Sequence, residues 1–237
     1  MKHTEKPLSK TFSHWTIDEI VRIFGVNVAY EGMDIRPLLL PELSPTETEV
    51  QEISFLRSRL VDNITLWNED ELEFFFLSPF INMVNFYEKP IKPFKERPLK
   101  AQLDEWTLSG EVDWVLSHGF GSPVAPFFCL KEFKKARSPL YPPIWGDKGG
   151  NDPEGQLAAA MLVAEVLNDL KYPQLNRPIY GAYLLGREWT FVQMYKRQML
   201  QAIPLLLTDE SSLQKILMVM KKMKDMALKE ARELLIK

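Results

Sequence analysis

The spacing of apolar residues divides the chain into regions of helical and strand-like character. In some segments apolar residues recur every three or four positions, which is typical of a helix with one buried face. In others they alternate with polar residues, which favours a strand. Helices are predicted over residues 15–24, 44–66, 68–86, 152–169 and 209–235. Strands are predicted over residues 101–105, 106–117, 126–134, 177–185, 188–195 and 199–207. Residues 1–13 are polar and are predicted to be a frayed end.

Capping and turn residues refine several of these boundaries. Ser44 is the predicted N-cap of the second helix, with Pro45 at its first position. Pro79 is expected to kink or divide the third helix, and the segment 88–100 holds three prolines, so it cannot be a continuous helix. Gly186 and the residue after it predict a two-residue hairpin turn.

This order of elements predicts a mixed α/β domain. We expect an N-terminal helical extension, residues 1–66, packed on a core domain, residues 67–237. The last predicted helix carries an apolar stripe that includes Met220 and Met223. Such a stripe is a packing face against this chain or against a second copy, so a homodimer is one possible assembly.

Composition narrows the class of protein further. The chain has 237 residues, a net charge of −3, 46% hydrophobic residues and a single cysteine, Cys129. These values exclude a disordered chain and a disulfide scaffold, and the absence of an intrachain disulfide fits a reducing compartment. The longest apolar run, residues 157–167, is too short to cross a membrane, and the first residues lack an apolar signal core. We therefore expect a cytoplasmic protein without a membrane partner.

Charged residues at two predicted strands form the candidate chemistry. Asp113 lies in one strand, and the next apolar strand ends in Glu132-Phe133-Lys134. Residues two apart in a strand share a face, so Glu132 and Lys134 point the same way. Carboxylate oxygens select Mg²⁺ or Mn²⁺, and the carbonyl oxygen of Phe133 could add another ligand. Taken singly, Asp113 also fits an exposed strand carboxylate, and Glu132 with Lys134 fits a weak ion pair at a strand end.

The ordered set of these residues resembles the PD-(D/E)xK nuclease superfamily. The set consists of Gly-Glu-Val-Asp113, an apolar strand ending in Glu132-Phe133-Lys134, and a helix that opens Glu-Gly-Gln156-Leu. Gln156 is similar to the extra helical motif of the recombination-exonuclease-like branch. The segment 65–207 also resembles a group of uncharacterised bacterial proteins with this fold, through a Trp-Asn-Glu helix and a Tyr-Gly…Gly-Arg-x-Trp-x-Phe hairpin.

The resemblance implies a restriction-endonuclease-like core, with a central mixed sheet flanked by helices and a long C-terminal helix. It implies that Asp113 and Glu132 bind Mg²⁺ or Mn²⁺ and that Lys134 is the catalytic lysine. It also implies a supporting Gln156 and a Glu from the preceding helix, for which we favour Glu71 over Glu73. No Pro precedes Asp113, and the usual aromatic residue after Gln156 is missing. The alternative is therefore a catalytically inactive module of the same fold that binds nucleic acid or a protein.

The net charge conceals two basic segments. Residues 89–100 hold five cations against one acid, and residues 131–137 hold four cations against one. Phosphates are contacted mainly by Lys and Arg, so these segments predict a nucleic-acid partner, with DNA favoured over RNA. The candidate contacts are Lys92, Lys95, Arg97, Lys131 and Lys135. The other reading of the first segment is a solvated connector.

Overall fold

A large mixed sheet forms the centre of the protein. The computed structural model describes residues 8–30, 38, 44–134 and 152–235. The described strands form one nine-stranded sheet in the order β1-β4-β5-β6-β7-β8-β2, with β3 paired to β4 and β9 to β7. The strands are β1 (Leu8–Thr11), β2 (Asn27–Tyr30), β3 (Lys92–Leu103), β4 (Trp106–His118), β5 (Val124–Lys134), β6 (Ile179–Leu185), β7 (Glu188–Tyr195), β8 (Gln198–Gln201) and β9 (Leu205–Leu206). The prediction of a mixed α/β fold is confirmed.

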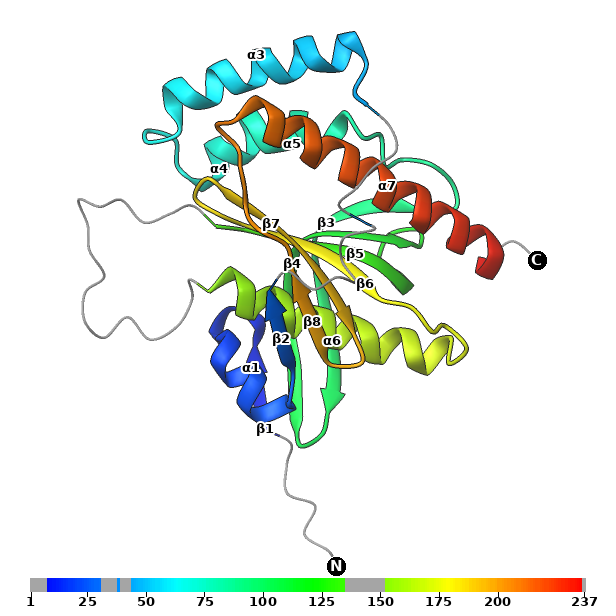
Figure 1. Ribbon diagram of the computed structural model, residues 1–237. Helices are drawn as coiled ribbons and strands as arrows, with labels where there is room; N and C mark the ends of the chain where they lie inside the picture. The colour runs from blue at the N-terminus through cyan, green and yellow to red at the C-terminus, as the bar shows by residue number, and fades with distance from the viewer. Residues whose placement is uncertain (1–7, 31–37, 39–43, 135–151, 236–237) are drawn as a thin grey trace, which may run out of the picture.

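Helices cover both faces of the sheet (Figure 1). The helices are α1 (Ile17–Phe24), α3 (Glu47–Asn63), α4 (Glu69–Leu72), a π-helical turn (Glu73–Leu77), α5 (Ser78–Asn82), α6 (Pro153–Lys171) and α7 (Glu210–Leu235), with a 3₁₀ turn at Phe12–His14. One hydrophobic cluster joins α1 and α6 to the sheet, and a second joins α3, α5 and α7 to its other face. The apolar stripe of α7 therefore packs on this chain's own core, through Met220 and Met223 among others. The homodimer therefore remains a prediction, and the apolar stripe of α7 no longer supports it.

The N-terminal region differs from its prediction because it joins the sheet. β1 pairs parallel with β4, and β2 pairs parallel with β8. Both strands are only four residues long and contain no buried residue, so their sequence carries no periodic signal. The predicted N-terminal extension therefore contributes two strands, β1 and β2, to the central sheet.

Two of the predicted helices differ from their predicted bounds or regularity. The N-cap of α3 is Thr46 rather than Ser44, because the Thr46 hydroxyl accepts from the Glu49 amide while the Glu49 carboxylate accepts from the Thr46 amide. This reciprocal pair satisfies two amide donors. The predicted helix 68–86 ends at Asn82 and is divided by the π-helical turn that precedes Pro79. Pro79 lacks an amide hydrogen, which is consistent with this local widening.

The proline-rich segment 88–100, which was predicted not to be a continuous helix, is mainly strand. In the described part of the chain β3 pairs only with β4, and Pro93 and Pro98 are tolerated because an edge strand does not need every amide. The β3–β4 ladder is interrupted at Glu96 and Asp113, and Glu96 has a φ of +49°.

No helix among the described residues is long and apolar enough to cross a membrane.

Candidate functional site

The Asp113 side chain joins β4 to β5 where the two strands separate. Their ladder begins at the pair of Trp114 and Lys131 and does not include the two residues before it in β4 and after it in β5. One Asp113 carboxylate oxygen accepts a hydrogen bond from the backbone N–H of Phe133, with 2.7 Å between oxygen and nitrogen. The Asp113 carboxylate thus takes the place of the backbone carbonyl that a neighbouring strand would offer to this amide. The contact brings the predicted ligand Asp113 against the peptide that follows Glu132.

Glu132 lies on the sheet face that α6 covers. Its side chain is only 5% exposed, and its strand partner in β6 is Tyr183. Neighbouring residues in register share a face, and Tyr183 packs with the cluster that contains α6. Gln156, in the first turns of α6, is also buried. The structure therefore places Glu132 and Gln156 in the same layer between β5 and α6.

The remaining members of the predicted motif are only partly described. The Lys134 backbone pairs with Leu185 as the last residue of β5, but the Lys134 side chain lies outside the described residues. Across the described ranges no group of three or more Asp, Glu, His or Cys side chains could hold a metal. A Mg²⁺ site commonly uses one or two carboxylates and leaves other positions to water and substrate. Asp113, Glu132 and the Phe133 carbonyl fit that kind of site by donor chemistry.

A chain of hydrogen bonds extends from the neighbour of Glu132 to the start of α6. The Tyr183 hydroxyl donates to the Gln201 side-chain oxygen at 2.8 Å, and the Gln201 amide donates to a Glu154 carboxylate oxygen at 2.5 Å. Burial raises the pKa of Glu154, and burial together with the nearby Glu154 charge raises the pKa of Tyr183. Tyr183 is therefore held as a neutral hydrogen-bond donor beside Glu132.

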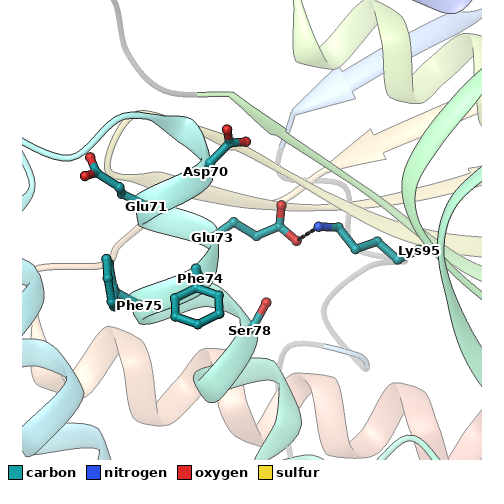
Figure 2. Close-up of a pocket in the computed structure, with 7 residues that line it drawn as sticks. All are labelled: Asp70, Glu71, Glu73, Phe74, Phe75, Ser78 and Lys95. Carbon is teal, nitrogen blue, oxygen red and sulfur yellow. Dashed lines mark ion pairs between the residues drawn. The ribbon is translucent and has the colours of Figure 1, made fainter.

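The helix before β3 presents two glutamates in different roles (Figure 2). Glu71 caps its own helix: its carboxylate accepts from the Asn68 amide at 2.8 Å. Glu73 instead extends toward Lys95 and forms an ion pair with a distance of 2.8 Å between the carboxylate oxygen and the ammonium nitrogen. Glu73 lines the same cavity of about 220 Å³ as Asp113, whereas Glu71 does not. Glu73 is thus better placed than Glu71, which we favoured from the sequence, to support Asp113.

Lys131 must be removed from the predicted nucleic-acid contacts. Its side chain is fully buried, at 0% exposure, and its aromatic neighbours belong to the cluster on the sheet face opposite α6. Its ammonium nitrogen lies 4.2 Å from the Trp114 ring centre and 4.9 Å from that of Phe86. The same nitrogen lies 3.2 Å from the Met220 sulfur. Cation–π attraction favours a lysine in such surroundings, and phosphate cannot reach it there.

The other predicted basic contacts divide into three cases. Lys95 and Arg97 are exposed on the edge strand β3, and Lys95 also pairs with Glu96 at 3.2 Å. The Lys92 ammonium donates to the Phe120 carbonyl and lies 4.9 Å from the ring centre of Phe94. Lys135 lies outside the described residues.

Sequence reasoning missed Glu154, Tyr183 and Gln201 as neighbours of the site. Glu154 stands two positions before Gln156, but nothing in the chain order connects it with a tyrosine in β6 or a glutamine in β8. Glu73 was considered and ranked second. The sequence did contain an indication in favour of Glu73. It follows Glu71 by two positions, and only one of these two glutamates can cap the helix start.

Known proteins add no further constraint to this site. A scan against protein-family models finds none that matches the chain, and a search of curated proteins finds no match either.

Proposed function

We propose that this protein is a Mg²⁺- or Mn²⁺-dependent nuclease with a restriction-endonuclease-like core, and that it cleaves phosphodiester bonds in nucleic acid, with DNA favoured over RNA. The observation that carries the proposal is the hydrogen bond from the Phe133 amide to the Asp113 carboxylate. It joins the two segments that the ordered motif singles out, at the place where β4 and β5 separate. A cavity of about 220 Å³, lined by Asp113 and Phe133 among others, lies beside this junction.

The residues of the site would divide the work in the following way. Asp113, Glu132 and the Phe133 carbonyl would hold the ion, which when bound lowers the pKa of a coordinated water and offsets phosphate charge. The Phe133 amide orients the Asp113 carboxylate. Tyr183, whose hydroxyl donates to Gln201, is the strand partner of Glu132. Lys134 would orient the attacking water or stabilise developing negative charge as a compact cation.

The test is cleavage of labelled single- and double-stranded DNA and RNA with Mn²⁺, comparing the wild type with Asp113→Asn. An asparagine oxygen can still accept from the Phe133 amide, so the strand junction is kept while the charge is removed. We expect cleavage to fall by at least about 100-fold. Glu111→Gln, an exposed acid on the same strand, is the matched control and should cleave normally. No cleavage by the wild type, or equal cleavage by Asp113→Asn, contradicts the proposal.

A non-catalytic module of the same fold is the second candidate, favoured by the deep burial of Glu132. A carboxylate with little exposure reaches a hydrated ion only if its surroundings open. Isothermal titration of Mn²⁺ separates the two candidates. Affinity that disappears in both Asp113→Asn and Glu132→Gln supports the nuclease, whereas affinity independent of both residues supports the module.

A further inference from the structure

Two hollows that share lining residues lie near Asp113, and the smaller one includes it. The larger, about 430 Å³, is lined by Phe74 and Phe75 together with acids of α4, and the smaller, about 220 Å³, is lined by Tyr87 and Asp113 among others. Both are lined by Glu73 and Lys95, which form the ion pair seen in Figure 2. Their volumes suit planar groups of nucleobase to nucleotide size, and a duplex does not fit into either.

Each hollow has one large aromatic side chain that faces solvent. Phe74 is 72% exposed and Tyr87 is 69% exposed. A single exposed aromatic residue is ordinary on a protein surface. Two of them, one in each of two adjoining hollows beside a candidate phosphodiesterase site, provide stacking surfaces for unpaired bases.

The charges divide the same region into a part that attracts phosphates and a part that repels them. The larger hollow is acidic, with Asp70, Glu71 and Glu73 against Lys95. The neighbouring edge strand β3 is basic, with Arg97 and three lysines exposed or half-exposed against one glutamate. Cations two or three residues apart in a strand stand about 7–10 Å apart along its axis. A phosphate backbone is therefore favoured along β3, while uncharged bases enter the hollows.

We propose that this surface binds single-stranded nucleic acid, with bases stacked on Phe74 and Tyr87 and the backbone following β3 toward Asp113. This inference rests on the proposed function, because it names the substrate class of that site. In duplex nucleic acid the base faces are already stacked on one another, so these two side chains discriminate against it. Lys95 contributes when a phosphate replaces Glu73 as its partner.

Binding is measured without cleavage, in EDTA, by fluorescence anisotropy of a fluorescein-labelled twelve-residue oligothymidylate. Base–aromatic stacking contributes about 1–3 kcal/mol per base, so Phe74→Ala and Tyr87→Ala should each weaken binding by about 5- to 100-fold. Tyr30→Ala is the matched control, because Tyr30 is 68% exposed and lies in β2 at the opposite end of the sheet. The same oligonucleotide paired with its complement should bind more weakly than the single strand.

A second measurement tests the path of the backbone. Replacing both Arg97 and Lys100 by Ala should reduce the slope of log affinity against log salt by about 0.7 for each phosphate that these side chains neutralise in the wild type. Equal affinity of Phe74→Ala, Tyr87→Ala and Tyr30→Ala, or tighter binding of the duplex, overturns the inference. These results are separable from the proposed function. Stacking-dependent binding without Mn²⁺-dependent cleavage refutes the nuclease alone, and cleavage that is indifferent to Phe74 and Tyr87 refutes the single-strand surface alone.

Discussion

Asn168 ties the strand that carries Glu132 to the helix that carries Gln156. Its side chain accepts from the Phe127 amide at 2.7 Å and donates to the Phe127 carbonyl at 2.9 Å, so α6 supplies both hydrogen bonds that a neighbouring strand would give. Both residues are buried. Removal of this side chain leaves two buried backbone groups without these partners.

The expected cost of Asn168→Ala follows from the two hydrogen bonds. An unsatisfied buried donor or acceptor costs about 1–3 kcal/mol. Two such groups predict a loss of about 2–6 kcal/mol, less if water enters. For a chain of this size, each kcal/mol lowers the melting temperature by about 2–4 °C. Asn168→Asp should be at least as damaging at pH 7, because its carboxylate faces the Phe127 carbonyl. It should recover in part at lower pH, where a protonated carboxyl can donate.

Urea denaturation followed by circular dichroism measures these differences. Asp169→Ala is the control, since Asp169 is the next residue of the same helix and is exposed. It should change the free energy of unfolding by no more than about 0.5 kcal/mol. A loss below about 1 kcal/mol for Asn168→Ala would show that Phe127 finds other partners and that this link does not hold α6 to β5.

Three further predictions test other parts of the structure. Burial raises the pKa of Glu230 to about 7, above its ordinary 4.5, so the folded state favours the protonated carboxyl. Raising the pH from 5 to 8 should therefore destabilise the wild type relative to Glu230→Gln. Denaturation curves should show a difference of at most about 3 kcal/mol. A Cβ at Gly155 would stand 2.5 Å from backbone at the start of α1, whereas one at Gly121 meets open space; thermal melting should show a loss of about 2 kcal/mol or more for Gly155→Ala and almost none for Gly121→Ala. Glu71→Ala should cost about 1 kcal/mol of stability through its helix cap and leave cleavage intact, whereas Glu73→Ala should lower cleavage; the reverse pattern would restore the sequence-based choice.

Local sequence patterns were sufficient to predict several elements of the fold. Glu188–Tyr195 forms a strand with the bounds predicted, and the two-residue turn before it contains Gly186 with a φ of +65°. The helices at Pro153–Lys171 and Glu210–Leu235 also lie within two residues of their predicted ends. In each case the residues that decide the conformation are close in the chain, so periodicity, caps and turn residues suffice.

Elements held by distant partners could not be found in this way. β1 and β2 are too short to show a period, and they exist because β4 and β8 offer them backbone partners. β3 contains prolines that argue against a strand, and only its place at the edge of the sheet makes them acceptable. The burial of Lys131 was equally hidden, because its aromatic neighbours come from segments far apart in the chain.

The sequence by itself determined the order of the main elements, the mixed α/β class and the ordered set of Asp113, Glu132 and Gln156 as candidates, because residue type and spacing suffice for these. Tertiary structure decided which of them meet. The separation of β4 from β5 brings Asp113 to the Phe133 amide, and the capping of α4 engages Glu71 and leaves Glu73 to face the cavity beside Asp113. These contacts depend on the relative placement of strands and helices, which is fixed by packing between residues distant in sequence.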